Sequence, residues 1–244
     1  MTAGSDVQRI RLQPAYVLHS RDYRDTSAFL DVLTPAFGRV SLLAKGVKQS
    51  RFSARRAVLQ PFRSLLVSWQ GRGDLYTLTQ VEEQGKPLIL NGVWLICGYY
   101  ISELTQRLAT RGDASAELFA LYDATVRELA REASPEPLLR MFEVRLLHAL
   151  GYAPDFSCCV NGHEPVDPEM QYRFTPEFGA VPASLAKGMG LPVSGRTLIA
   201  LERQDFSASS VCTEAKQLLR GILRHYLGDQ PLRSRELFKA YAKK

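Results

Sequence analysis

Five short apolar runs in the first 84 residues limit the possible folds more than any other feature of the chain. The runs are rich in Val, Leu, Phe and Tyr, and polar or glycine-containing segments separate them. Such runs are typical of short β-strands. They lie at Ala15–Ser20, Ala28–Leu33, Arg39–Ala44, Phe62–Trp69 and Leu75–Glu82. Five short strands in about 80 residues suit a small closed barrel, most often an OB-fold, so we expect an OB-fold domain at residues 1–84.

The pattern becomes helical from about Val93 onwards. Apolar residues recur at a spacing of three to four in 93–108, and a second helical segment follows at 117–131. Ser134-Pro135-Glu136 then supplies an N-cap, a first-turn proline and an early acid for a third helix, which we expect to end before Gly151. We therefore predict a helical domain at 85–150.

The segment 151–195 is dense in proline and glycine, which indicates an irregular module rather than another helix pair. Helical patterns return in 196–244, at Thr197–Arg203, Thr213–Leu227 and Ser234–Tyr241. We expect these helices to complete the helical domain. The predicted class is an α+β multidomain protein, with an N-terminal OB-fold barrel followed by a helical domain that carries an irregular insertion.

The charge of the protein is concentrated in one window. Between Val32 and Gly73 there is no acidic residue, although the whole chain has 31 Lys+Arg and 25 Asp+Glu, a net charge of +6. A solvated surface usually mixes both signs, whereas a single-sign patch is typical of proteins that bind polyanions. We expect DNA phosphates to be bound by Arg39, Lys45, Lys48, Arg51, Arg55, Arg56 and Arg72.

The segment from Lys45 to Arg56 lies between two predicted strands, so we interpret it as a loop, or a loop with a short helix, attached to the barrel. Its basic and hydroxyl side chains suit phosphate oxygens. Phe52 could stack on a base or pin the loop to the core. No base-reading helix is recognisable, so we expect binding through the phosphate backbone. If about six phosphates of a single strand are neutralised, the log–log salt slope is near −4.

Catalytic signals are weak. A P-loop, a dinucleotide-binding fingerprint, G-x-S-x-G and H-E-x-x-H are all missing from the sequence, and its four histidines are scattered. We therefore predict no enzymatic activity. Two alternatives stay open: a metal-dependent enzyme acting on nucleic acid through acids in Asp155–Glu169, and an adaptor whose basic window contacts an acidic protein.

Metal and membrane signals are equally weak. Cys158, Cys159 and His163 are weak metal candidates, because they supply at most three ligands and a structural zinc site needs four. We expect no metal and no cofactor. There is no apolar run long enough to span a bilayer and no signal-peptide core, so we expect a cytoplasmic protein without membrane contact.

Arg140 lies on the apolar helical segment Leu138–Leu147. A basic residue at the edge of an apolar groove suits an acidic, hydrophobic peptide. The alternative is an ordinary exposed arginine on an amphipathic helix.

Several short stretches, taken together and in order, resemble the RecO family of bacterial recombination mediator proteins over nearly the whole chain. They are Val17-Leu18-His19-Ser20-Arg21, Gly38-Arg39-Val40, Ala44-Lys45-Gly46, Leu59-Gln60-Pro61-Phe62, Tyr100-Ile101-Ser102-Glu103-Leu104, Phe142-Glu143, Leu150-Gly151-Tyr152 and Pro231-Leu232-Arg233-Ser234-Arg235-Glu236-Leu237-Phe238.

The resemblance implies an OB-fold, a helical domain and a zinc-finger-like module. It also implies binding of ssDNA and dsDNA, annealing of complementary strands and loading of RecA onto SSB-coated ssDNA, with RecR as partner. Such a protein is nucleoid-associated when it is on DNA. The acidic, hydrophobic C-terminal tail of SSB would bind the helical domain, where Arg140 stands at the matching position. The sequence departs from the four-cysteine zinc site of some members, so we expect a metal-free module.

Overall fold

The computed structural model describes residues 8–49, 53–72, 75–160 and 164–241 of the 244-residue chain. The chain forms two compact units. The first contains Met1–Glu132 together with Leu232–Lys244, and the second contains Ala133–Pro231. The four-segment division drawn from the sequence stays a prediction.

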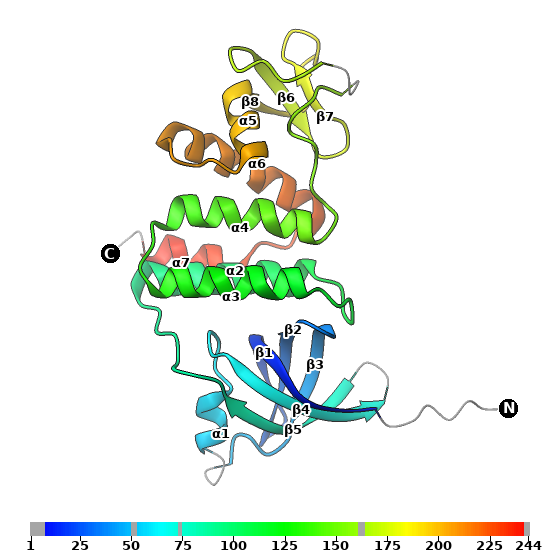
Figure 1. Cartoon of the computed structure of the whole chain (residues 1–244), viewed down its shortest axis with the longest axis vertical. Helices are drawn as coiled ribbons and strands as arrows, with labels where there is room; N and C mark the ends of the chain where they lie inside the picture. Colours follow the sequence, from blue (N-terminus) through cyan, green and yellow to red (C-terminus); the bar gives the residue numbers. More distant parts are fainter. Residues whose placement is uncertain (1–7, 50–52, 73–74, 161–163, 242–244) are drawn as a thin grey trace, which may run out of the picture. The chain divides into compact units, whose positions relative to one another are not determined.

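A closed five-stranded barrel forms the N-terminal part of the first unit (Figure 1). Its strands are β1 (Gln8–Tyr23), β2 (Ser27–Thr34), β3 (Gly38–Ala44), β4 (Leu65–Arg72) and β5 (Leu75–Glu83). They are joined in the order β1-β2-β3-β5-β4, and all pairs are antiparallel except β3 with β5. This closed, five-stranded arrangement has the form of an OB-fold, so the predicted fold class is confirmed.

The long strand β1 closes the barrel because it pairs with two partners. Residues Gln8 to Ala15 pair with β4, and residues Tyr16 to Tyr23 pair with β2. Register shifts between Ile10 and Gln13 and between Val17 and His19 bend the strand, as β-bulges do. Alternate side chains therefore point into one core, which contains Val17, Leu30, Val32, Leu42, Val67 and Trp69.

The segment between β3 and β4 contains a short helix, α1 (Ser53–Val58). The strand predicted from Phe62 begins only at Leu65. Phe62 has a positive φ of 65° and is buried, and its ring lies so close to α2 that a Cβ added to Gly98 would be 2.8 Å from it. Phe62 therefore packs against a helix instead of extending the barrel strand.

Three helices accompany the barrel in the first unit: α2 (Gly92–Leu108), α3 (Ala116–Ala130) and α7 (Arg233–Tyr241) (Figure 1). Helix α2 packs against β1, α3 and α7. The carboxylate of Glu103 accepts hydrogen bonds from the backbone N–H groups of Arg233 and Ser234, at 2.8 and 2.9 Å. This contact holds the start of α7, which returns to the first unit from the far end of the chain.

The second unit combines helices with a small sheet. Its helices are α4 (Pro135–Ala149), α5 (Gly195–Arg203) and α6 (Ser209–Leu227), and its strands are β6 (Gln171–Thr175), β7 (Gly179–Pro182) and β8 (Leu191–Ser194), in the order β7-β6-β8. The module predicted as irregular thus contains a sheet, because Tyr172, Phe174 and Val193 bury one apolar face. Within the described part of the chain, no helix is long and apolar enough to cross a membrane.

Candidate nucleic-acid interface

Acids from outside the acid-free window reach three of its basic residues. The Lys48 ammonium lies 2.8 Å from the Asp22 carboxylate in β1, and the Arg39 guanidinium lies 3.8 Å from Asp31 in β2. Arg63 forms an ion pair with Glu83 in β5. Because barrel closure brings these carboxylates beside the window, the local positive charge is smaller than the sequence indicates.

Three other basic residues of the window are exposed. Lys45 follows β3, Arg56 lies in α1, and Arg72 ends β4. None of the ion pairs formed by the described residues involves these three side chains. Cationic groups that face water without an internal acid can bind phosphate without first giving up another partner. Lys45, Arg56 and Arg72 are therefore the most available of the predicted DNA-binding residues that the structure describes.

Lys48 and Arg56 meet at one cavity of about 190 Å³, which Asp22 also lines. Arg55 is directed elsewhere, since it is half-buried and its Nη2 donates to the Leu78 carbonyl at 3.3 Å. Burial lowers the pKa of Arg55. This bond ties α1 to β5. Arg51 and Phe52 lie outside the described residues.

Arg39 lies at the seam between the barrel and the connection that joins α2 to α3. Its Nε donates to the Ala109 carbonyl at 3.0 Å, and its own carbonyl accepts from the Gly112 N–H at 3.0 Å. Burial lowers the pKa of Arg39; Asp31 opposes this shift and the nearby positive charge of Arg111 adds to it. Arg111 was not predicted as a site residue, because this residue and Arg39 meet only in the folded chain.

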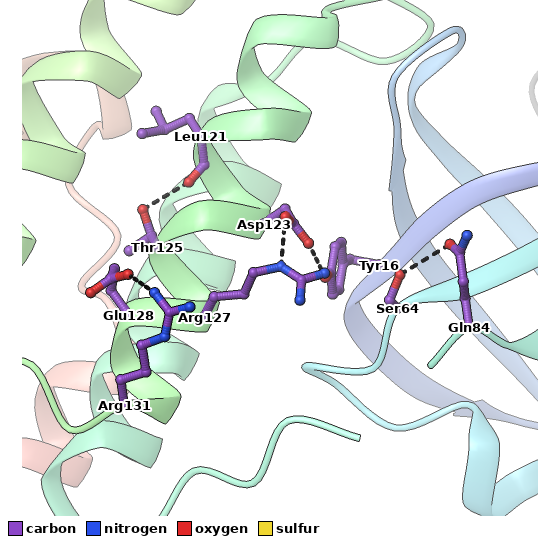
Figure 2. Close-up of polar contacts among 9 residues, drawn as sticks. All are labelled: Tyr16, Ser64, Gln84, Leu121, Asp123, Thr125, Arg127, Glu128 and Arg131. Carbon is purple, nitrogen blue, oxygen red and sulfur yellow. Dashed lines mark hydrogen bonds and ion pairs between the residues drawn. The ribbon is translucent and has the colours of Figure 1, made fainter. Parts of the chain in front are cut away.

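A network of hydrogen bonds holds α3 against the barrel at the same seam (Figure 2). The buried Tyr16 hydroxyl donates to Asp123 Oδ1 at 2.5 Å, and Arg127 Nε donates to Asp123 Oδ2 at 2.9 Å. Burial of Asp123 by itself raises its pKa, but the hydrogen bonds from Arg127 and Tyr16 outweigh it, and the pKa of Asp123 is lowered. Burial and the neighbouring Asp123 hold the pKa of Tyr16 well above its ordinary value.

A second contact fixes the α2–α3 connection on the barrel. Gly38, at the start of β3, has a φ of 58°, and a Cβ at this position would lie 1.9 Å from the Asp113 carbonyl oxygen. Only glycine allows such an approach of two backbones. Gln106 Nε2 also donates to Asp31 Oδ2 at 3.1 Å. The side chains of this connection are therefore held at a defined place beside β3.

Arg140, the residue predicted to bind the SSB tail, is buried in α4 with 5 % of its surface exposed. It is thus not the ordinary exposed arginine of the alternative interpretation. Its Nη2 donates to Glu143 Oε1 at 2.6 Å. Its Nε is buried and has no hydrogen-bond acceptor among the described residues. Tail binding by Arg140 stays a prediction.

The metal candidates do not form a recognisable site in the described residues. Cys158 and Cys159 are free, half-buried thiols, and burial raises the pKa of Cys159. His163 lies outside the described residues. No group of three or more His, Cys, Asp or Glu side chains that could hold a metal occurs in the ranges that the structure covers. Of the acids in this region, Asp155 has a local partner, since it accepts a hydrogen bond from the Ser157 backbone N–H at 2.7 Å.

Comparison with known proteins gives the same relatives for both parts of the chain. The family model "Recombination protein O N terminal" matches residues 10–84, and "Recombination protein O C terminal" matches residues 91–236. A DNA repair protein RecO of Nitrosococcus oceani is 44% identical over 231 residues, which cover 95% of this chain and 94% of the relative. A DNA repair protein RecO of Haemophilus influenzae is 44% identical over 227 residues, covering 93% and 95%.

Proposed function

The chain belongs to the RecO family, and from this membership we propose that it is a DNA-binding recombination mediator in DNA repair. It binds ssDNA and dsDNA, anneals complementary strands and, together with RecR, helps to load RecA onto SSB-coated ssDNA. It has no catalytic step of its own, and it works in the cytoplasm, on the nucleoid when DNA is bound.

One observation supports the DNA-binding part of the proposal most directly. Lys45 and Arg72 on a closed OB-type barrel, and Arg56 in the adjoining helix α1, are exposed and form no ion pair with the described acids. Such barrels bind extended strands, and unpaired cations release counterions when they contact phosphates. Annealing then has a simple electrostatic basis, because cations bound to the phosphates reduce the repulsion between two complementary strands.

The salt dependence of DNA binding tests this mechanism. Each phosphate neutralised on a single strand contributes about −0.7 to the slope of log K against log salt, so three contacts give about −2 and six give about −4. We expect a slope of −2 or steeper for the wild-type protein with oligo-dT, measured by fluorescence anisotropy. A slope close to zero would refute binding through these cations.

Neutralising substitutions locate the surface. The triple variant Lys45→Gln, Arg56→Gln, Arg72→Gln should reduce the magnitude of the slope by about 2 and lower the affinity for all sequences alike. Arg63→Gln is the matched control, since Arg63 belongs to the same window but is paired with Glu83. A folded triple variant that keeps the wild-type slope would place the DNA elsewhere, for example on the basic residues around α7.

We propose that the SSB tail binds the second unit at Arg140. The Nε donor without an internal acceptor supports this, because a tail carboxylate can accept from it when peptide binding exposes the buried atom. Arg140→Leu should therefore bind a labelled SSB-tail peptide at least tenfold more weakly than the wild type while binding oligo-dT equally well. Equal binding of the peptide by a folded variant would exclude this role.

A further inference from the structure

A pocket of about 230 Å³ lies on the barrel wall, where the α2–α3 connection meets β3. Three aromatic residues and two arginines line it, from segments that are far apart in the chain: Phe37, Trp69, Tyr76, Arg39 and Arg111. None of the described residues that line the pocket carries a carboxylate group. The pocket therefore combines aromatic surface with positive charge.

The aromatic residues form a connected group. The ring centroids of Phe37 and Trp69 are 5.3 Å apart with an interplanar angle of 84°, and those of Trp69 and Tyr76 are 6.3 Å apart. Trp69 is 1 % exposed and belongs to the barrel core, whereas Phe37 and Tyr76 keep part of their surface accessible. The rings of Phe37 and Tyr76 therefore pack on the buried Trp69. They can bind a flat apolar ligand at little cost in side-chain entropy.

The backbones of both arginines and the side chain of Arg39 are held in place before any ligand arrives. Their backbones pair as an isolated β-bridge, and the Ala109 carbonyl fixes the Arg39 guanidinium. Two like charges that share one pocket repel each other, and the repulsion is larger where burial reduces screening by water. Arg111 itself is exposed and forms no ion pair with a described acid. Asp31, 3.8 Å from the Arg39 guanidinium, offsets part of this repulsion, and an anion between the two guanidinium groups would relieve the rest.

We infer that this pocket binds one unstacked nucleotide of a DNA single strand, with the base against Phe37 and Tyr76 and a phosphate between Arg39 and Arg111. The volume is below the roughly 300–1,000 Å³ of sites for drug-sized ligands, so it fits a single nucleotide unit and not a stacked run. Stacking is tolerant of sequence because every base has a π-face. The inference rests on the proposed function, since it names the ligand of the same barrel.

The DNA strand can continue from this pocket to the exposed Arg72. Gly71 in β4 pairs with Gln8 in β1 and with Tyr76 in β5, and both of these partners line the pocket. Arg72 follows Gly71 directly. The exposed guanidinium of Arg72 therefore extends from the strand beside the pocket, where it can hold the next phosphate.

Photocrosslinking identifies the residues that touch a base. A single strand containing 5-iododeoxyuridine is irradiated with the full-length protein, and the crosslinked peptides are mapped by mass spectrometry. We expect crosslinks at Phe37 or Tyr76. Crosslinks confined to other parts of the chain would overturn the inference, while DNA binding itself, and with it the proposed function, would stand.

Affinity measurements supply the second test. Phe37→Leu keeps an apolar side chain beside Trp69 but removes the ring, and it should weaken binding of oligo-dT about fivefold or more. The loss should disappear when the oligonucleotide is abasic, because no base is left to stack. Arg111→Ala should weaken binding of both strands, and Arg131→Ala, which removes the exposed arginine at the C-cap of α3, is the matched control.

The outcomes separate the two proposals. If wild-type protein binds no single strand, the proposed function fails and the pocket inference fails with it. If the single strand binds and Phe37→Leu binds normal and abasic strands as the wild type does, only the pocket inference fails. Free dTMP that displaces oligo-dT at an equal concentration would assign the pocket to a free nucleotide and overturn the claim that it serves a strand.

Discussion

Removal of the Tyr16 hydroxyl tests how much one hydrogen bond between the barrel and α3 contributes to the free energy of unfolding. The hydroxyl is the described donor from the barrel to Asp123 in α3 (Figure 2). Tyr16→Phe keeps the ring, which lies 5.7 Å from the Phe119 ring and 5.2 Å from the Tyr122 ring. The substitution therefore removes the polar contact and leaves the aromatic packing.

The expected loss follows from the surroundings of Asp123. A hydrogen bond to a charged group contributes about 1.5–3 kcal/mol to the free energy of unfolding. The Asp123 side chain is 29% exposed and keeps its bond to Arg127, so water and Arg127 compensate for part of the loss. We expect a loss at the lower end of the range, about 1.5 kcal/mol. This loss corresponds to a roughly tenfold increase in the equilibrium constant for the opening of α3.

Urea unfolding and hydrogen exchange of the α3 amides measure this effect. Tyr23→Phe is the matched control, because no described residue forms a hydrogen bond with the Tyr23 hydroxyl and the ring packs on Phe29. We expect faster exchange of α3 amides in Tyr16→Phe and unchanged exchange in Tyr23→Phe. Equal free energies of unfolding for wild type and Tyr16→Phe at pH 7 would refute the reasoning.

The pH dependence gives the same test an internal check. The folded-state pKa of Asp123 lies below its ordinary value of 3.8, so the folded state favours the carboxylate. Its contribution is present above about pH 4 and is lost as the pH falls through the folded pKa. The difference between wild type and Tyr16→Phe should therefore shrink on acidification, and a difference that is independent of pH would contradict a role for the charged carboxylate.

Two further predictions concern the same unit. Gly38→Ala should destabilise the protein by more than the roughly 1–2 kcal/mol of a left-handed alanine, because its Cβ would lie 1.9 Å from the Asp113 carbonyl oxygen. The control is Gly85→Ala, whose Cβ would have no neighbouring atom within 4 Å. In urea unfolding, this control should show the cost of the left-handed backbone alone. Glu103→Gln should cost about 1 kcal/mol, since the N-terminus of α7 loses a charged acceptor, and should speed hydrogen exchange of the α7 amides selectively. Unchanged α7 exchange would mean that packing alone holds the helix.

Local sequence patterns predicted a helix correctly where residues close together in the chain determine its structure. The predicted helix at 93–108 is α2 within one residue, and the helix expected from Ser134 to Gly151 is α4. The strands were recognisable because the barrel buries one face of each. Phe62 shows where this fails: its apolar side chain fits a strand pattern, but it packs beside Gly98 in α2, and no local rule contains that contact.

Site residues were harder to predict than elements, because charge depends on distance in space. Asp22, Asp31 and Glu83 lie outside the acid-free window, yet the barrel places each beside one of its cations. Arg140 in α4 is a second example. Its sequence context also fits an exposed arginine, but in the fold it is buried against Glu143. A charge count along the chain treats all of these side chains as equivalent.

The amino-acid sequence was sufficient for the barrel followed by helices and for the region with excess positive charge, because these depend on local composition and periodicity. The family followed from the resemblance of several short stretches taken in order. The folded structure was needed to show which cations are available and that Arg39 meets Arg111 beside three aromatic rings. The reason is physical: electrostatic and stacking interactions act over a few ångströms, and only folding brings residues from β3, β4, β5 and the α2–α3 connection within that range.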